Sequence, residues 1–298
     1  MFMSKRKPVR ISFKTFSEQY SGEDVCREKL ASFRWPNGFE CPHCHGKRFC
    51  KLSNGRYQCA ECHHQTSVTA GTFLHRSHVS LVVWFQAIYL VTQDKRGISA
   101  TQLAFMVGVN YKTAWLMLKK IRTAMFQRDA KYLLDGIVEM DDAYIGGPTV
   151  GKKRGRGTEK AKFFVALSLD EQRHPRFLKL SVTENLQKDT VRAFAESSIE
   201  KGSVVESDGY RSYIPALTSF EHHHKKYDPD SGMLKWMHTM IGNVKNAILG
   251  TYHGLPKKYL NLYFAEQCYR FNRRSFGAGL FDRLLVALSA APVADSNG

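Results

Sequence analysis

Three successive segments in the second half of the chain have apolar residues in the pattern of β-strands. Residues 137–145 (IVEMDDAYI) have the pattern of a buried strand, and a Gly-Gly turn closes it at 146–147. Two further strand-like segments follow at 163–170 and 176–184, and a short polar turn separates them. The three segments together predict an antiparallel meander.

The elements that follow the meander alternate between helix and strand. A helix is expected over 187–200, and residues 203–213 then give a short strand that ends at Asp208. Another helix, a strand over 222–227 and a long helix over 234–249 complete the pattern. Three antiparallel strands, a helix, a strand with a terminal aspartate and then a helix form the element order of an RNase-H-like fold with a mixed sheet.

The first half of the chain is dominated by helical periodicity. Residues 79–91 form the longest apolar run, which is 13 residues long and interrupted by Gln86. This run is too short to cross a bilayer, so it predicts a core helix. The basic N-terminus has no apolar segment after it and does not have the pattern of a signal peptide.

Residues 97–122 (GISATQLAFMVGVNYKTAWLMLKKIR) have the pattern of two helices joined by a tight turn. Ser99 and Asn110 are the expected N-caps, and Leu103 and Met106 are expected on the inner face of the first helix. In the second helix, Ala114, Met117 and Leu118 are expected to point inward. The outer face then carries Tyr111, Lys112, Thr113 and Lys119. This matches a helix-turn-helix whose second helix enters the major groove of DNA, and a plain helical hairpin is the alternative.

Carboxylates occur where the strand pattern predicts burial. Asp141 and Asp142 lie inside the first strand of the meander, and Asp208 ends a later strand. Buried carboxylates are costly unless they are paired or hold a metal ion. Oxygen ligands of this kind suit Mg²⁺ or Mn²⁺, and two such ions can activate a water or a 3′-hydroxyl for phosphodiester displacement.

The cysteines predict a second metal site. Six of the seven cysteines lie within residues 26–62, and four of them form the pairs CPHC (Cys41, Cys44) and CAEC (Cys59, Cys62). Two such knuckles can place four thiolates around one structural zinc ion, with a hairpin turning at Asn54-Gly55 between them. A redox dithiol is the alternative, and nearby histidines could replace one cysteine. Cys26 and Cys50 are expected to be ordinary buried residues.

Charge adds a polyanion to the expected partners. The formal net charge is +17, which predicts attraction to nucleic acid. A basic housekeeping enzyme that binds no nucleic acid is the alternative. The segment 148–160 is basic and almost without large apolar residues. It is expected to be a loop that contacts the DNA backbone or a solvated spacer, and its candidate contacts are Lys152, Lys153, Arg154 and Arg156.

Several segments together resemble one known family. They include FRWPNGFECPHC, CAEC leading into TAGTFLHRS, SATQLAFMVGVNYKTAW, VEMDDAYIGG, SDGYRSY, WMHTMIGNVKNAILGTYHG and YRFNRR. From about residue 20 to 275 the chain is similar to insertion-sequence transposases that join an N-terminal zinc ribbon to a DDE-type catalytic domain. It resembles the branch with asparagine as the third residue.

The resemblance implies the residues of the catalytic site. It implies Asp141, Asp208 and Asn243 as catalytic residues and Mg²⁺ (or Mn²⁺) ligands. Asp142 is expected to support them or to replace Asp141 as a ligand. Other residues are kept as candidates: His238 and Lys245 beside the site, Glu266 as a rival third acid, and Arg273 and Arg274 as DNA contacts.

The expected protein is an α+β multidomain transposase that acts on DNA in the cytoplasm, in association with the nucleoid. Its expected parts are a segment with the zinc ribbon (1–74), a helix-turn-helix-like region (75–130), an RNase-H-like catalytic domain (131–286) and a tail (287–298). The resemblance implies cleavage of 3′ ends and their transfer into target DNA by at least a dimer, with no membrane partner. A repair nuclease, or a DNA-binding regulator with an inactive nuclease domain, remains the alternative.

Overall fold

The computed structural model describes residues 11–94, 96–146, 160–226, 228, 233–252 and 255–292. The chain divides into two compact units, Met1–Gln127 with Arg273–Gly298 and Arg128–Asn272. Each is described by itself. Within the described residues, no helix is both long enough and apolar enough to cross a membrane.

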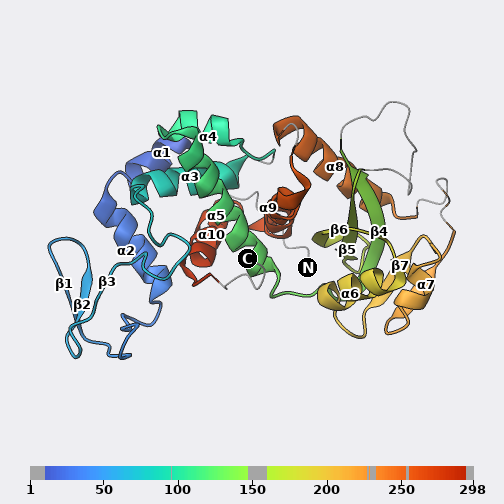
Figure 1. The fold of residues 1–298 in the computed structure, drawn as a ribbon, viewed down its shortest axis with the longest axis horizontal. Helices are drawn as coiled ribbons and strands as arrows, with labels where there is room; N and C mark the ends of the chain where they lie inside the picture. The colour runs from blue at the N-terminus through green and yellow to red at the C-terminus, as the bar shows by residue number, and fades with distance from the viewer. Residues whose placement is uncertain are drawn as a thin grey trace, which may run out of the picture. The chain divides into compact units, whose positions relative to one another are not determined.

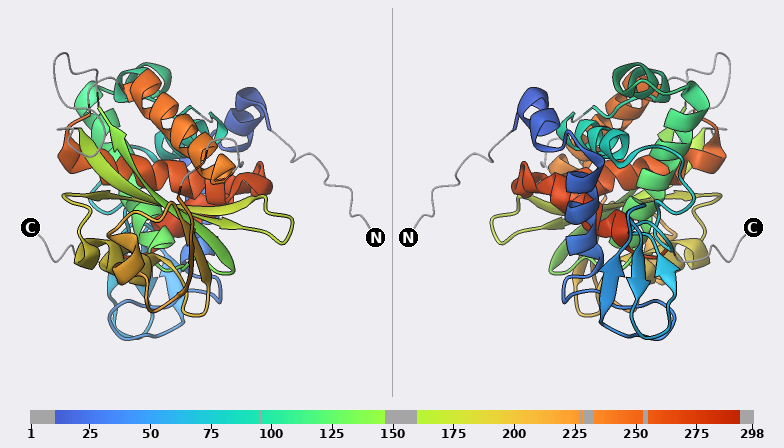
Figure 2. Two further views of the ribbon diagram at one scale, coloured as in Figure 1. Left: turned by 90° about the vertical axis from the view of Figure 1, so that its right-hand side faces the viewer. Right: turned by 90° about the vertical axis from the view of Figure 1, so that its left-hand side faces the viewer.

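The N-terminal unit contains a small three-stranded antiparallel sheet, whose strands lie side by side in Figure 2. Its strands are β1 (Phe49–Lys51), β2 (Tyr57–Cys59) and β3 (Gln65–Thr66). The turn between β1 and β2 contains Gly55 with a φ of +75°, a left-handed conformation that glycine adopts without strain. The hairpin predicted around Asn54-Gly55 is therefore confirmed.

Four helices of the same unit pack together, and an aromatic cluster joins three of them. They are α1 (Phe13–Gln19), α2 (Glu23–Arg34), α3 (Leu81–Gln93) and α10 (Gly279–Ser289). The rings of Phe16, Tyr20, Phe85 and Phe281 lie within 5.6 Å of one another along the contacts that join α1, α3 and α10. The cluster includes a helix from the far end of the sequence. The sequence analysis had placed most of α10 in the catalytic region.

Two helices form the predicted hairpin, α4 (Ala100–Val107) and α5 (Tyr111–Asp129). The hydroxyl of Ser99 accepts a hydrogen bond from the backbone of Gln102, and the amide oxygen of Asn110 accepts one from Thr113. Gly108 ends α4 in the left-handed conformation, with a φ of +69°. The expected caps are thus confirmed.

The inner faces of α4 and α5 differ from the prediction at one position. Leu103, Ala114, Met117 and Leu118 are buried as expected. Met106 is exposed, and Val107 takes the inward position because it lies four residues after Leu103. The prediction of an inward Met106 was wrong by one residue.

The second unit is built on a five-stranded mixed sheet. Its strands are β4 (Ile137–Ile145), β5 (Ala161–Leu169), β6 (Pro175–Thr183), β7 (Val204–Ser207) and β8 (Glu221–His224). Their order is β6-β5-β4-β7-β8. The first three form the predicted antiparallel meander, whereas β7 pairs with β4 in parallel and β8 with β7 in parallel. This arrangement agrees with the RNase-H-like fold expected from the order of elements.

Helices cover both faces of this sheet (Figure 1). On one face α8 (Lys235–Tyr252) and α9 (Leu260–Asn272), with the short 3₁₀ helix η3 (Lys257–Tyr259) before α9, pack against Ala143 and Val165. On the other, α6 (Lys188–Ser198) and α7 (Tyr213–Ala216) pack against Val138, Met140 and Phe164. Because both faces are covered, polar side chains in β4 become buried, and their orientation depends on the alternation of the strand. A second 3₁₀ helix, η4 (Arg274–Phe276), belongs to the other unit.

Candidate functional site

The parallel pairing of β4 with β7 brings two aspartates together. Met140 lies opposite Ser207 in the register of these strands, so the next residues, Asp141 and Asp208, follow side by side where β7 ends. Neighbouring strands are about 4.8 Å apart. Asp141 is buried and Asp208 is half-buried. The two carboxylates that the sequence singled out therefore lie at one point of the sheet.

Local backbone bonds orient both aspartates. One carboxylate oxygen of Asp141 accepts a hydrogen bond from the backbone of Asp142 at 2.7 Å. Asp208 accepts one from the backbone of Tyr210 at 3.0 Å, which closes a turn directly after β7. Each of these bonds uses one carboxylate oxygen, and a carboxylate has two oxygens that can each accept more than one bond.

Asp142 lies on the opposite face of the sheet from Asp141, because successive strand residues alternate. Its carboxylate accepts a hydrogen bond from the hydroxyl of Tyr213 at 3.2 Å. Burial and the nearby carboxylates of Asp142, Asp141 and Asp208 raise the pKa of Tyr213 well above its usual value. The phenol thus stays protonated and ties Asp142 to α7.

A second pair of carboxylates lies on the same strands, two residues before the aspartates. Glu139 and Glu206 are opposite each other in the register of β4 and β7. The guanidinium of Arg173, in the turn between β5 and β6, binds Glu206 at 2.5 and 3.2 Å. Burial first, and then the Glu206 charge, raise the pKa of Glu139 to about 7, although Arg173 and a bond from the backbone of Met237 oppose this. One oxygen of Glu139 is buried without a hydrogen bond.

The face of α8 that carries His238 and Lys245 is directed toward the aspartates. These residues are seven apart, or nearly two helical turns, so they share a face. Burial and the Lys160 ammonium lower the pKa of Lys245, and the charge of Asp141 raises it. Burial also lowers the pKa of His238, which the charge of Asp208 raises. Both candidates therefore lie within electrostatic reach of the carboxylate pair.

Asn243 lies on a different face of the same helix. It lies two positions before Lys245, which corresponds to a rotation of about 200°. It instead shares a face with Trp236, whose ring lies 6.4 Å from that of His174 in the β5–β6 turn. The role of Asn243 stays a prediction from the resemblance.

Glu266 is enclosed in its own network within the second unit. It is fully buried on α9, forms an ion pair with Arg270 at 3.3 Å and accepts a hydrogen bond from Tyr252 at 3.2 Å. The carboxylate thereby links α8 to α9, and removing one partner would leave a buried charge uncompensated. This environment favours a structural role for Glu266 over the rival role of third acid.

The four cysteines of the two knuckles form a compact cluster. Their sulfur atoms all lie within 4.8 Å of one another, with Cys41 and Cys62 at 3.6 Å and Cys44 and Cys59 at 3.5 Å. Zinc–sulfur bonds of about 2.3 Å in a tetrahedron place sulfurs about 3.8 Å apart, so the cluster fits one zinc ion. Although burial opposes it, bonds from the backbone of Cys44 and His43 lower the pKa of Cys41 to about 7.

The neighbouring histidines lie around the cluster rather than in it. His45 is paired with Glu40 at 2.8 Å, and the rings of His43 and His64 stack at 5.7 Å. Among the described residues, the metal-competent cluster consists of the four cysteines. Cys26 is buried as expected, but Cys50 is exposed on β1, which corrects the expectation of a buried residue.

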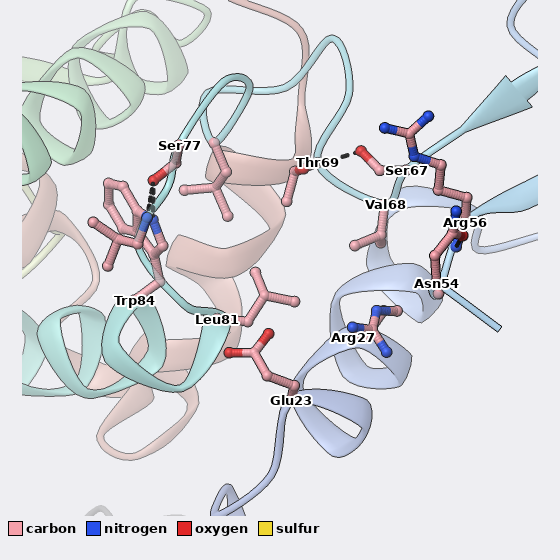
Figure 3. Close-up of a pocket in the computed structure, with 13 residues that line it drawn as sticks. Glu23, Arg27, Asn54, Arg56, Ser67, Val68, Thr69, Ser77, Leu81 and Trp84 are labelled. Carbon is pink, nitrogen blue, oxygen red and sulfur yellow. Dashed lines mark hydrogen bonds between the residues drawn. The ribbon is translucent and has the colours of Figure 1, made fainter.

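A cavity of about 220 Å³ lies where the tip of the ribbon hairpin meets α2 and the start of α3 (Figure 3). Arg27 of α2 approaches the hairpin so closely that a Cβ at Gly55 would lie 2.6 Å from its guanidinium carbon. Arg34 donates to the backbone carbonyls of Ser67 and Val68. Two α2 arginines thereby attach the ribbon to the helices of its unit.

The structure describes only some of the residues that are expected to contact DNA. Tyr111, Lys112 and Lys119 are exposed at the start of α5, and Thr113 is half-buried. In the other part of the N-terminal unit, Arg274 is exposed and Arg273 is half-buried. The basic residues of the expected loop lie outside the described residues: Lys152, Lys153, Arg154 and Arg156.

Two family models match the chain. A model described as the ISXO2-like transposase domain matches residues 133–272, and one described as the transposase zinc-ribbon domain matches residues 21–65. Together they match more than half of the chain. The two matched regions belong to this family of transposase domains. The matched catalytic region contains the whole five-stranded sheet with α8 and α9, and the matched ribbon contains all four clustered cysteines.

The chain is also similar to known proteins. A Halobacterium salinarum protein named as an uncharacterized protein in transposable element ISH50 is 28% identical over 206 residues, which are 62% of this chain and 67% of that protein. Two solved structures are similar at 12% identity. One is a simian T-cell lymphotropic virus intasome in complex with a PP2A regulatory subunit (52% of this chain, 57% of that chain, TM-score 0.27). The other is the Mos1 transposase paired-end complex with the left transposon end (70% and 79%, TM-score 0.25).

The transposase chain thus spans less than two thirds of the intasome chain. With TM-scores this low, neither solved structure supports a further inference about the site.

Sequence reasoning missed three contacts around the transposase site. They are the bond from Tyr213 to Asp142, the ion pair of Arg173 with Glu206 and the backbone bond from Met237 to Glu139. The only signal for Glu139 and Glu206 was their position two residues before each aspartate, which places them on the same strand face. The partners come from turns and helices that the strand pattern does not locate.

Removing one ligand of the cysteine cluster should release the zinc ion. We expect Cys44→Ser to lower the bound zinc from about one ion per chain toward zero and to destabilise the ribbon, because the metal supplies most of its folding free energy. Metal content by atomic emission and thermal unfolding measure both effects. Cys50→Ser is the matched control, since it alters an exposed cysteine of the same ribbon. Full zinc content in Cys44→Ser would contradict the assignment.

Acid should destabilise the sheet through His222 on β8. Its ring bonds the Ser207 hydroxyl at 2.9 Å, and burial followed by the charges of His224 and His223 lowers its pKa to about 4. The folded state thus disfavours the charged ring. The stability from this residue is present above pH 6.5 and is lost as the pH falls toward 4. We expect His222→Gln to lose less unfolding free energy than wild type between pH 7 and pH 4.5 in denaturant titrations. An identical loss in both proteins would refute this.

Proposed function

We propose that the chain is the transposase of an insertion sequence, which cleaves the 3′ ends of its element and joins them to target DNA. The observation that carries the proposal is the parallel register that places Asp208 beside Asp141 within a matched transposase domain. Two adjacent carboxylates at the end of a sheet supply hard oxygen ligands for divalent cations. The pair gives the domain the donor set that metal-assisted phosphodiester chemistry requires.

In the proposed reaction, a water molecule attacks the phosphodiester at the element end. The bond from phosphorus to the 3′ oxygen breaks, and the element keeps a free 3′-hydroxyl. That hydroxyl then attacks a target phosphodiester, so one phosphorus–oxygen bond forms as another breaks. Mg²⁺ (or Mn²⁺) held by Asp141 and Asp208 would supply Lewis-acid activation of the attacking oxygen and the leaving oxygen. The protein itself forms no covalent bond to the DNA.

Residues around the carboxylate pair have distinct proposed tasks. The Lys245 ammonium, which already interacts with Asp141, would contact the phosphate that is attacked. His238 would do so from the Asp208 side of the same helix face. Tyr213 holds Asp142 on the far face, which supports Asp141 as the metal ligand of the two neighbours.

DNA binding is proposed from the distribution of charge. The chain carries a formal net charge of +17, and the segment from Lys95 to Arg128 contains seven basic residues and no acidic one. This segment includes α4 and all of α5 except its last residue, Asp129, and its field favours a polyanion over a protein partner with mixed charges. The proposed partners are the terminal repeats and the target DNA, with which at least two copies would assemble in the cytoplasm because two ends must be joined.

Replacing either aspartate should abolish both chemical steps while leaving DNA binding intact. We expect Asp141→Asn and Asp208→Asn to lower nicking and strand transfer at least a thousandfold, since each removes one of two anionic ligands from the metal site. The assay uses DNA that carries the element ends, with Mg²⁺, Mn²⁺ or chelator. Asp189→Asn is the matched control, because it alters an exposed carboxylate in the first turn of α6 in the same domain.

Three results would change the proposal. Nicking without strand transfer would identify a repair nuclease. End binding by every protein, with no cleavage by any, would identify a DNA-binding regulator. Cleavage that survives in both aspartate variants would place the chemistry elsewhere.

The identity of the third catalytic residue can be decided on α8. From the orientation of the helix we expect Lys245→Ala to slow cleavage about a hundredfold, because a cation within reach of Asp141 is lost. Asn243→Ala should slow it less than tenfold. Cleavage rates at saturating DNA measure this contrast, and Asn246→Ala is a control for an exposed asparagine on the same helix. The reverse ranking would mean that α8 turns when metal and DNA bind and that Asn243 is the ligand.

A further inference from the structure

The outer face of α5 has an unusual composition for a helix that reads DNA. Successive residues of a helix are rotated by about 100°, so Tyr111, Lys112, Trp115, Leu116 and Lys119 form one continuous face over the first three turns. The inward positions Ala114, Met117 and Leu118 lie on the other side. The face therefore consists of two aromatic residues, one leucine and two lysines.

This face is open and apolar. Tyr111 is 56% exposed and Leu116 is 53% exposed. Tyr111, Lys112, Trp115 and Leu116 together line a surface pocket. The ammonium of Lys119 lies 5.8 Å from the centre of the Trp115 ring, which holds a positive charge at the border of the apolar surface. A clustered apolar surface of this kind marks an interaction site.

The side chains on this face limit what it can recognise. Adenine is usually read by paired hydrogen bonds from asparagine or glutamine, and guanine by such bonds from arginine or lysine. From Tyr111 to Lys119 the chain contains no arginine, asparagine or glutamine, and of its two lysines, Lys112 and Lys119, the second lies over the Trp115 ring. Asn110, which precedes the helix, uses its amide oxygen to cap Thr113. Apolar side chains in the major groove recognise instead the 5-methyl group of thymine.

We propose that α5 recognises thymine methyl groups in the major groove of the element ends, through Leu116 and Tyr111. The two lysines neutralise the phosphates on either side of the groove. This inference rests on the proposed function, because it assumes that the transposase binds its element ends, and it adds the class of base that is read.

Charge decides between DNA and a protein as the occupant of the apolar face. From Lys95 to Arg128, which leaves out only Asp129 at the end of α5, the chain has no acidic residue, so a docked protein would find no counterpart there for its own basic groups. Phe105 on α4 is 88% exposed and also adds apolar surface outside the face of α5. Exposed apolar surfaces of this kind can also pair between two copies of one chain. A second copy is the competing occupant, and the test includes it as an outcome.

The experiment replaces thymine with uracil, which removes the 5-methyl group and leaves the base pairing unchanged. Full-length protein first selects duplexes from a random pool. The selected duplex is then made with thymine and with uracil, and the Kd of each is measured. We expect the uracil duplex to bind about fourfold more weakly for each methyl group contacted.

Variants attach the effect to α5. Leu116→Ala should weaken binding to the thymine duplex and reduce the difference between the two duplexes. Val25→Ala, which shortens an exposed aliphatic residue on α2, should behave as wild type. Lys112→Ala should weaken both duplexes equally and lower the salt dependence of binding.

Each contrary result is distinct. Equal Kd values for the two duplexes would overturn the inference while leaving DNA binding by the transposase in place. A full thymine–uracil difference in Leu116→Ala would assign methyl recognition to another part of the chain. A smaller oligomer in Leu116→Ala, with the thymine–uracil difference unchanged, would make the face a contact between copies. Failure to select any duplex would reject sequence-specific end binding, and the proposed function would lose that part.

Discussion

Two carboxylates held side by side are the constraint on which the catalytic domain depends. Parallel pairing forces Asp208 next to Asp141, at a place where one is buried and the other half-buried. At about 5 Å and an effective dielectric constant of about 20, their repulsion is about 3 kcal/mol. A fold tolerates this strain where a cation balances the charges. The ammonium of Lys245 on α8 interacts with Asp141. Arg173 binds Glu206, which belongs to the second carboxylate pair, Glu139 and Glu206.

The rest of the domain fixes the position of that pair. Helices on both faces bury the central strands, so the alternation of β4 sends Asp141 toward α8 and Asp142 toward α7. Asp141 and Asp142 therefore have different surroundings and different proposed roles, although they are adjacent in the sequence. Glu139, on the same face as Asp141, accepts a backbone bond from the first turn of α8 and so links the catalytic strand to the helix that carries Lys245. In the N-terminal unit, the cysteine cluster organises a ribbon whose own apolar core is small.

Much of this arrangement could be predicted from the sequence. The short apolar runs bounded by turns located β4, β5 and β6, and the spacing of the cysteine pairs identified a zinc ribbon that the family match supports. The parallel pairing of β7 could not be derived from its four residues, although the order of elements suggested it. The position of α10 depends on an aromatic cluster formed with distant residues, and no local pattern encodes such a contact. The helix face on which Asn243 lies could not be predicted either, because the resemblance supplies a position in the chain and not a rotation about a helix axis.

The central claim is that Asp141 and Asp208 together bind a divalent cation. The most direct measurement is a titration of the zinc-loaded, full-length protein with Mn²⁺, followed by the electron paramagnetic resonance signal of the free ion. The account predicts saturable Mn²⁺ binding in the wild type, competition by Mg²⁺, and loss of that binding in Asp141→Asn and in Asp208→Asn. Equal Mn²⁺ binding by the wild type and both variants would contradict it, because the carboxylate pair would then not be the metal site.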